Sequence, residues 1–381
     1  MRRLLVLLSS MTAGILFALP VVPGSAGTGG HPAITITSNT DFATCGCVTS
    51  GNGTAASPFI IGPWAINAPS AGGYSVKIDN TSGLITDHFN IFGISSTYND
   101  TNPSDPTIWL VNVNPVNPPT TISGTGAHPT SGNDLGMGIE LDNSSNIAID
   151  GVSYNKGNGI GVYINGSENV SINNSKFKAT CDICVQHTGD GIYAVGSSNL
   201  QIGNGADCPK STPCNDVTYD DGFGIYLQNT HDVVINQATA DANDTGGYVL
   251  DGTGTYNVTL ENSRAQGDGN ICFTVNGQKM NSGYHTDLQG GLHLINGAHN
   301  NDITNDSFGG GTSLDVASGG NPGSGGKTVY YDACVSMNVP FTPKPPETSE
   351  TSMGTGNSFS NICYADTNIP VSVLGPSTCK S

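Results

Sequence analysis

Apolar and polar residues alternate in short runs through the middle of the chain. Within residues 136–149, Ile139 and Leu141 form one apolar pair, and a polar bend separates them from a second pair, Ile147 and Ile149. Alternation with a period of two predicts a strand with one buried face. The runs are too short, and too closely flanked by glycine, to form helices. Each run therefore predicts two short strands joined by a bend.

This pattern repeats along the chain. Residues 159–172 match residues 136–149 at an offset of 23, and residues 189–202 and 222–235 fit the same frame. The inward pairs expected on the first strand of each repeat are Ile139/Leu141, Val162/Ile164, Ile192/Ala194, Ile225/Leu227, Tyr248/Leu250, Phe273/Val275, Leu292/Leu294 and Leu314/Val316. Those expected on the second strand are Ile147/Ile149, Val170/Ile172, Leu200/Ile202, Val233/Ile235 and Val258/Leu260.

A unit of this size cannot bury its apolar face alone and must stack on its neighbours. We therefore expect an all-β chain that forms a single right-handed parallel β-helix. Leucine-rich repeats have a similar period, but their Leu-x-x-Leu-x-Leu signature is absent from the sequence. The expected organisation is a signal peptide at 1–26, an N-terminal cap and first coils at 27–133, core repeats at 134–318, and loop-rich C-terminal coils with a cap at 319–381.

The first residues resemble a secretory signal. Arg2 and Arg3 give a basic start, residues 4–22 are largely apolar, and residues 24–26 are small. This pattern predicts a signal peptide, with an uncleaved membrane anchor as the alternative. No second apolar stretch approaches the roughly 18 residues that a spanning helix needs. We therefore expect a secreted or cell-surface protein with no membrane span after signal removal.

The charge excludes one class of partner. The net charge is −18 with 11% charged residues, and Arg264 is the only arginine after the signal. Binding to the phosphates of nucleic acids requires clustered basic residues, so we expect no nucleic-acid partner.

Ten cysteines follow the signal, and an even number in an exported chain favours disulfides. The candidates are Cys45, Cys47, Cys181, Cys184, Cys208, Cys214, Cys272, Cys334, Cys363 and Cys379. The pairs Cys181/Cys184 and Cys208/Cys214 lie in the two longest intervals between repeats, which predicts inserted loops held by local disulfides. Cys181 and Cys184 with His187 could instead belong to a metal site. Ten Asn-x-Ser/Thr sequons are consistent with a glycoprotein.

Two rows of polar residues are expected where neighbouring coils stack. Asparagine or aspartate precedes each second strand, which predicts a ladder at the bend because these residues tolerate left-handed backbone. Its members are Asn146, Asn169, Asn199, Asp232 and Asn257. If this ladder were buried, the sequons at Asn169 and Asn257 would be unusable.

The second row lies between the inward pairs of the first strand and faces outward. It holds Glu140, Tyr163, Tyr193, Tyr226, Val249, Thr274, His293 and Asp315. Tyrosine rings on successive coils offer flat apolar surfaces with polar edges against which a sugar ring can lie. We therefore name Glu140, Tyr163, Tyr193, Tyr226 and His293 as candidate carbohydrate-binding residues. The alternatives are a ladder that stabilises the sheet and a surface covered by a loop.

Aspartates form a further candidate site in the turns before the first strands. They are Asp190, Asp220, Asp221 and Asp244. Carboxylates on neighbouring coils could bind Ca²⁺ or act as an acid and base pair. The alternative is that these aspartates only form turns.

The motif Gly-Ile-x-Leu-x-x-Ser-x-Asn-Ile-x-Ile at 138–149 resembles the right-handed parallel β-helix repeat superfamily, which includes pectin-lyase-like and NosD-like exported proteins. Residues 189–192 and 220–222 resemble the Asp motifs of polygalacturonases, which implies a general acid and a water-activating base at Asp190 and Asp221. The family's His-Gly and Arg-x-Lys motifs are missing.

Two further implications of this superfamily can be stated. A uronate lyase would need a basic residue, and the nearest candidates are Lys156, Lys176, Lys178 and Arg264. The NosD-like resemblance implies copper, for which His285, His293 and His299 are the candidates.

The sequence thus favours a carbohydrate-binding or cell-surface structural module whose partner is a polysaccharide or surface glycan. The alternative is a polysaccharide-cleaving enzyme, a hydrolase rather than a Ca²⁺-dependent lyase. No cofactor is expected to be required, and Ca²⁺ stays an open alternative.

Overall fold

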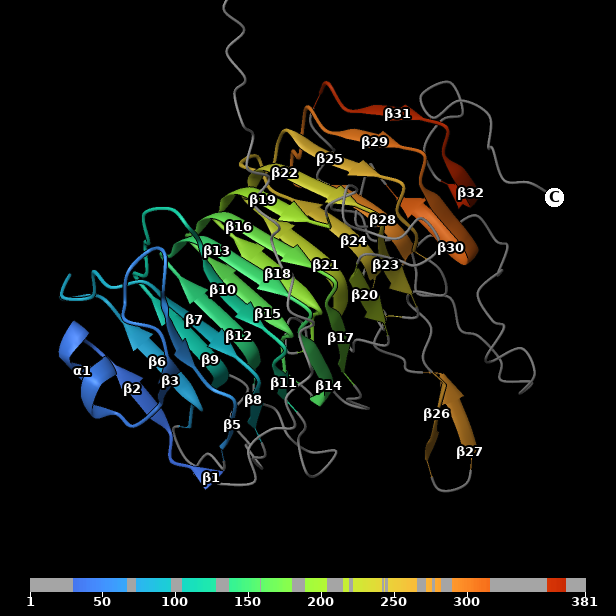
Figure 1. The fold of residues 1–381 in the computed structure, drawn as a ribbon. Coiled ribbons are helices and arrows are strands. Elements are labelled where there is room, and N and C mark those ends of the chain that lie inside the picture. The colour runs from blue at the N-terminus through green and yellow to red at the C-terminus, as the bar shows by residue number, and fades with distance from the viewer. Residues whose placement is uncertain are drawn as a thin grey trace, which may run out of the picture.

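The computed structural model describes fourteen stretches of the chain. They are residues 30–66, 73–96, 105–127, 137–157, 159–179, 189–203, 215–218, 222–241, 243, 246–265, 272–275, 278–281, 290–315 and 355–367. Within them, the chain winds into a solenoid whose walls are three long sheets (Figure 1).

The first sheet contains the strands that the sequence predicts as the first of each repeat. Its order is β2 (Ile34–Ile36), β6 (Val76–Asp79), β9 (Pro106–Val111), β12 (Met137–Asp142), β15 (Val162–Asn165), β18 (Ile192–Val195), β21 (Phe223–Gln228), β24 (Gly246–Asp251), β28 (Gly290–Ile295), β30 (Ser307–Asp315) and β32 (Cys363–Thr367). All of its neighbouring strands pair in parallel.

The second sheet contains the predicted second strands. Its order is β3 (Val48–Ser50), β4 (Phe59–Ile61), β7 (Phe89–Phe92), β10 (Thr120–Ser123), β13 (Ser145–Asp150), β16 (Glu168–Asn173), β19 (Ser198–Ile202), β22 (His231–Asn236), β25 (Val258–Glu261), β29 (Asp302–Thr304) and β31 (Ser358–Ser360). The third sheet consists of β1 (Gly30–His31), β5 (Trp64–Ile66), β8 (Ile94–Ser96), β11 (Gly126–Ala127), β14 (Ser153–Gly157), β17 (Lys176–Ala179), β20 (Asn215–Thr218) and β23 (Ala238–Asp241).

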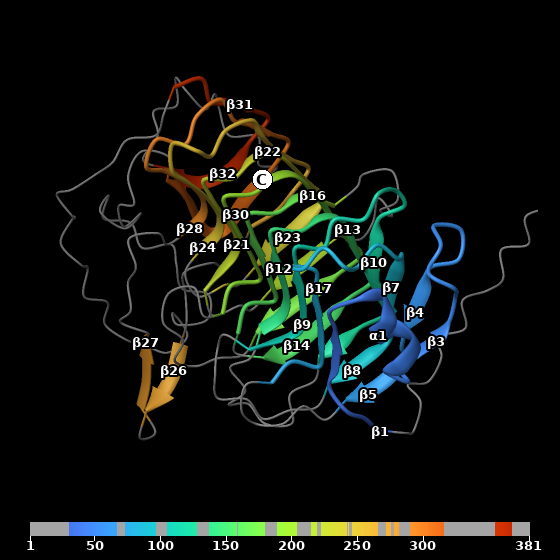
Figure 2. The same cartoon turned by 90° about the vertical axis from the view of Figure 1, so that its left-hand side faces the viewer.

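The three sheets, seen from a second side in Figure 2, enclose the hydrophobic core. On the first sheet, Ile139 aligns with Val162, and Val162 with Ile192. On the second, Ile149 aligns with Ile172. All five side chains are at most 2% exposed. Burying an aliphatic side chain of this size stabilises a fold by roughly 1.5–3 kcal/mol. The prediction of an all-β parallel β-helix is confirmed.

One predicted coil is wrong. Phe273 and Val275 lie in β26 (Cys272–Val275), which pairs antiparallel with β27 (Gln278–Asn281) in a separate two-stranded sheet. The strand that follows β24 in the first sheet is β28 instead. Period-two alternation occurs in hairpins as well as in solenoid strands, so the pattern alone does not distinguish the two. Val316, the last expected inward residue, lies outside the described residues.

The predicted asparagine ladder has the expected backbone. Asn146, Asn169, Asn199, Asp232 and Asn257 have φ angles of 56, 54, 54, 56 and 53°. These left-handed conformations turn the chain into each second strand. The side chains are not buried: the last four of the five are exposed. Burial of the ladder, which would make the sequons at Asn169 and Asn257 unusable, is therefore not observed.

A buried hydroxyl ladder lies at the same bend. It consists of Ser144, Ser167, Ser197, Thr230 and Thr255, each at most 2% exposed. Each hydroxyl accepts the backbone N–H of the equivalent residue one coil earlier, at 3.0–3.4 Å within the ladder. The first four also donate to a carbonyl two residues before them, at 2.9–3.0 Å. The ladder satisfies buried amides that the bends would otherwise leave unpaired.

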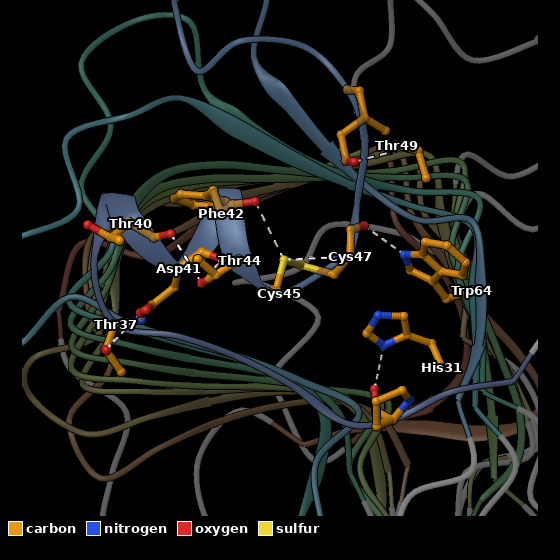
Figure 3. Close-up of a disulfide and its surroundings, with 12 residues drawn as sticks. His31, Thr37, Thr40, Asp41, Phe42, Thr44, Cys45, Cys47, Thr49 and Trp64 are labelled. Atoms are coloured by element: carbon orange, nitrogen blue, oxygen red, sulfur yellow. Dashed lines mark hydrogen bonds between the residues drawn. A yellow bond between two sulfur atoms is a disulfide. The ribbon is translucent and has the colours of Figure 1, made fainter.

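A short helix covers the N-terminal end of the core. In α1 (Asn39–Thr44), Phe42 is 2% exposed and its ring stacks on that of Phe59 at 5.0 Å. The chain continues into a disulfide between Cys45 and Cys47, shown in Figure 3. The helix and the disulfide thus lie at the N-terminal end of the described core.

The other cysteine predictions have different outcomes. Cys272 and Cys363 lie in strands. The remaining candidates lie outside the described residues, so the loops held by local disulfides stay a prediction: Cys181, Cys184, Cys208, Cys214, Cys334 and Cys379. Among the described residues, no helix is long and apolar enough to cross a membrane.

Candidate functional site on the outer face of the first sheet

The strand register of the first sheet places one outward residue per coil in a single line, which we call the outer row. The row consists of Lys77, Trp109, Glu140, Tyr163, Tyr193, Tyr226, Val249 and His293, and Asp315 aligns with His293 on the next strand. The alignment predicted from Glu140 to Tyr226 is therefore present. Thr274 is absent from it, because its strand belongs to the separate hairpin.

Exposure falls along the outer row toward the C-terminus. Tyr163 and Tyr193 are partly exposed. Tyr226 is 4% exposed, and His293 is completely buried. Tyr226 belongs to a small apolar cluster outside the main core, with Phe223, Val249 and Ile295. The accessible part of the row is therefore its N-terminal half, where Lys77, Trp109, Tyr163 and Tyr193 are partly exposed on either side of the buried Glu140.

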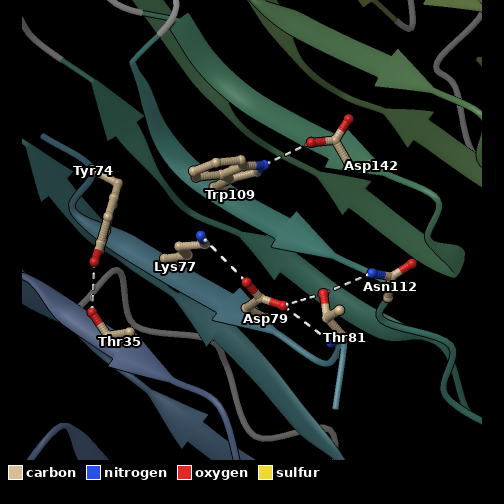
Figure 4. Close-up of polar contacts among 8 residues, drawn as sticks. All are labelled: Thr35, Tyr74, Lys77, Asp79, Thr81, Trp109, Asn112 and Asp142. Carbon is tan, nitrogen blue, oxygen red and sulfur yellow. Dashed lines mark hydrogen bonds and ion pairs between the residues drawn. The ribbon is translucent and has the colours of Figure 1, made fainter. Parts of the chain in front are cut away.

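A polar frame surrounds the Trp109 ring in this accessible half (Figure 4). The Lys77 ammonium lies 3.9 Å from the centre of the ring and 3.3 Å from Asp79. The indole Nε1–H donates to Asp142 at 2.8 Å. Asn165 donates its amide to the other oxygen of Asp142 at 3.0 Å. The ring is thus fixed at its face by Lys77 from the preceding coil and at its edge by Asp142 from the following one.

Glu140 lies next to this frame and is 9% exposed. Burial, together with the nearby charge of Asp142, raises the pKa of Glu140 to about 8, and the two carboxyl groups are hydrogen bonded. Glu140 is thus protonated at neutral pH. In this pair the protonated Glu140 thus lies beside the charged Asp142.

The tyrosines continue the row. The rings of Tyr163 and Tyr193 are 5.4 Å apart and tilted by 37°. The Tyr193 hydroxyl donates to Gln228 at 2.8 Å, and the Tyr226 hydroxyl donates to Asp251 at 2.7 Å. Burial raises the pKa of Tyr193 to about 12 and that of Tyr226 further still. These hydroxyls therefore stay protonated donors.

The predicted catalytic aspartates do not lie on this accessible face as far as they are described. Asp190 is completely buried, and its Oδ1 accepts the backbone N–H of Phe223 at 2.8 Å. Such a contact holds one coil to the next. Asp220, Asp221 and Asp244 lie outside the described residues, so their predicted role stays a prediction.

The residues proposed for metal or lyase chemistry do not gather at one place in the described part of the chain. No three His, Cys, Asp or Glu side chains there are arranged to hold a metal ion. His299 stacks on Tyr256 at a bend, far along the chain from the accessible half-row. Lys156, Lys176 and Lys178 belong to strands of the third sheet. Cys181, Cys184, His187 and His285 lie outside the described residues.

Sequence reasoning missed the residues at the N-terminal end of the row, Lys77, Trp109 and Asp142. A signal for one of them was present. Ile108-Trp109-Leu110 has the same inward–outward–inward pattern as Val162-Tyr163-Ile164. The repeat spacing is irregular before residue 134, and this hid the pattern.

Comparisons with known proteins give fold-level similarity. No protein-family model matches the chain, and no curated protein matches it. Among solved structures, the enzymatically active domain of bacteriophage CBA120 tailspike protein 2 is 12% identical, with a TM-score of 0.43 over 88% of this chain and 42% of that chain. The catalytic domain of a GH87 α-1,3-glucanase is 14% identical, with a TM-score of 0.47 over 89% of this chain and 60% of that chain.

An alginate lyase from Paenibacillus sp. is 10% identical, with a TM-score of 0.38 over 75% of this chain and 94% of that chain. The chain spans less than two thirds of the length of the tailspike and glucanase structures. The identities are 10–14% and the TM-scores are below 0.5, so the similarity is limited to the general course of the chain. It carries no argument about a site or an activity.

Proposed function

We propose that this chain is an exported carbohydrate-binding β-helix that holds an extended polysaccharide against the N-terminal half of its outer row. The observation that carries this proposal is the accessible line of Trp109, Tyr163 and Tyr193 with hydrogen-bonding groups along its edge. Sugars present apolar C–H faces and polar edges, and binding sites match them with aromatic rings bordered by a few placed polar groups.

The polar groups beside the row suit hydroxyl ligands. Asp142 is an acceptor that Trp109 and Asn165 hold in place, and the buried Glu140 beside it is neutral and adds no second negative charge. The one cation on this part of the row, Lys77, is paired with Asp79. Little unpaired positive charge is left for a polyuronate, so the proposed ligand is an uncharged glycan.

The test measures glycan retention and cleavage together. The purified protein is run through gels that contain neutral or acidic polysaccharides, and the same mixtures are assayed for new reducing ends. Tyr163→Ala should weaken retention by about tenfold, which corresponds to ~1.4 kcal/mol of binding free energy. Tyr163→Phe, which keeps the ring, should retain most of the affinity.

Three results contradict this proposal. Retention by none of the glycans refutes it, and so does equal retention by the unmodified protein and Tyr163→Ala. New reducing ends that disappear with a variant of Asp221 would instead establish the hydrolase alternative.

A further inference from the structure

A second groove lies on the other side of the molecule, over the second sheet. Its volume is about 620 Å³. The floor includes Ser171, Gln201 and Val234 from β16, β19 and β22, and Asn169 and Asn199 of the asparagine ladder line it. We call it the amide groove. Its strands belong to a different sheet from the outer row, so the two surfaces are separate.

The amides in the middle of this groove differ from several other left-handed asparagines. Four of those donate to a side chain one coil away at 2.8–3.3 Å: Asn174 to Asp150, Asn257 to Asp232, Asn262 to Asn236 and Asn361 to Asn305. Asn169 and Asn199 make no such side-chain hydrogen bond in the described structure, and neither do Ser171 and Gln201. Four polar side chains on two neighbouring coils are thus left free in one groove.

At each end of this group of four side chains, the next polar residue is hydrogen bonded within the protein. Asn146 donates its amide to the Pro115 carbonyl at 2.9 Å. Asp232 accepts from Asn257 at 3.0 Å and from His231 at 2.8 Å. These bonds lower the pKa of Asp232, so its carboxylate stays charged. The groove therefore has a fixed negative charge at one end and no lysine or arginine among its lining residues.

From these observations we infer that the amide groove is a second glycan-binding site, specific for an uncharged polysaccharide that runs along the solenoid axis. Amides and hydroxyls both donate and accept, as do the hydroxyl groups of sugars. Val234, which is 37% exposed, offers an apolar surface for a sugar face. Equivalent residues recur every ~4.8 Å along the axis, which is close to the advance of an extended glycan per sugar unit.

The same features disfavour other ligands. An acidic polysaccharide would meet the carboxylate of Asp232 without a compensating cation. An extended peptide binds a sheet by pairing with a free strand edge. Here each floor strand is already paired on both sides.

The experiment separates this groove from the outer row. It uses the full chain with Tyr163→Ala and Tyr193→Ala in place, so that the proposed outer-row site is removed. Affinity electrophoresis in mixed-linkage β-glucan, galactomannan and arabinoxylan is compared with polygalacturonate and alginate. At least one neutral polysaccharide should still retard this protein, and the two acidic ones should not.

Glycine substitutions then test the amides. Asn169→Gly with Asn199→Gly removes both side chains, and glycine accepts their positive φ angles without strain. Retention of the neutral glycan should fall about tenfold, equivalent to ~1.4 kcal/mol. Asn262→Gly, at a left-handed position outside the groove, is the matched control and should leave it unchanged. Ser171→Arg, which places a long side chain in the groove, should also abolish retention.

The inference is overturned by any of four results. The first is no retention by neutral glycans once the outer row is removed, and the second is undiminished retention by the double glycine variant. The third is an equal loss in Asn262→Gly, and the fourth is a preference for the acidic glycans. If the outer-row variants bind as well as the unmodified protein and the double glycine variant does not, the proposed function fails while this inference stands.

Discussion

Asp306 is a buried carboxyl group, and we expect its replacement by asparagine to stabilise the solenoid at alkaline pH. Its side chain is 2% exposed. Oδ1 accepts the Ser263 N–H at 2.7 Å, whereas Oδ2 has no partner in the described structure. Burial raises the pKa of this carboxyl to about 8. A charged carboxylate here would lack the partners that buried charges require.

The size of the effect follows from proton binding. In the unfolded chain an aspartate has a pKa of about 4. Between about pH 4 and pH 8 the folded protein holds a proton that the unfolded chain releases, so the free energy of unfolding falls as the pH rises. Each pH unit in this window corresponds to about 1.4 kcal/mol, and the whole window to roughly 5 kcal/mol. Below pH 4 both states are protonated and the cost disappears.

The chain itself shows how an amide fits such a position. Asn215 occupies the equivalent place on another coil, where its Oδ1 accepts the Ser175 N–H at 3.1 Å. Its Nδ2 donates to the Ile172 carbonyl at 2.9 Å. An asparagine at 306 can make the same two bonds, so Asp306→Asn should match the unmodified protein near pH 4 and exceed its stability by several kcal/mol above pH 8.

The assay is urea unfolding from pH 4 to pH 9, followed by circular dichroism, with hydrogen exchange of the Ser263 amide as a local measure. The reciprocal variant, Asn215→Asp, should gain the pH dependence that Asp306→Asn loses. If the stability difference between Asp306→Asn and the unmodified protein is the same at every pH, the reasoning from burial is wrong.

Three further predictions concern other parts of the fold. Ser197→Ala removes a buried hydroxyl that both donates and accepts, so it should lower the free energy of unfolding by about 1–3 kcal/mol. Ser198→Ala, at the next residue, should change this free energy little. Urea titrations of both variants measure the two free energies of unfolding. Reduction of the Cys45–Cys47 disulfide should cost about 1.5 kcal/mol or less, because so short a loop constrains the unfolded chain weakly, and a thermal melt with and without reductant measures it. Glu140→Gln should remove a loss of stability that the unmodified protein shows between about pH 4 and pH 8, where folded Glu140 keeps a proton that the unfolded chain releases; a melt series across that range checks it.

The sequence predicted the coils well where the pattern was complete. Val162 and Ile164 could be assigned because each apolar pair was followed by a left-handed asparagine and a second apolar pair. Phe273 and Val275 lacked that continuation and turned out to form a hairpin. Alternation of apolar and polar residues indicates only that one face of a strand is buried. The bend residues that follow the strand indicate that it belongs to a solenoid coil.

The candidate site was less predictable, for a physical reason. Alternation gives the direction of Tyr226 and His293, but not what lies over them, and both are buried. The apolar residues at outward positions near them, Val249 and Ile295, were a signal that this part of the face is covered. Free hydrogen-bonding capacity, as at Asn169 and Asn199, depends on side-chain contacts that no sequence pattern encodes.

Because of the hydroxyl ladder, whole coils can be added to or removed from the solenoid without changing how the remaining coils bond to one another at this bend. Each coil with a serine or threonine at this bend makes the same hydroxyl-to-amide hydrogen bond with the coil before it and the coil after it. If one such coil is duplicated or deleted, the coils that become neighbours can make that bond again. Ala298 occupies the next position after Thr255 and has no hydroxyl, so the interchangeable region ends there. Tandem duplication within 144–255 would thus lengthen both the outer row and the amide groove in steps of ~4.8 Å.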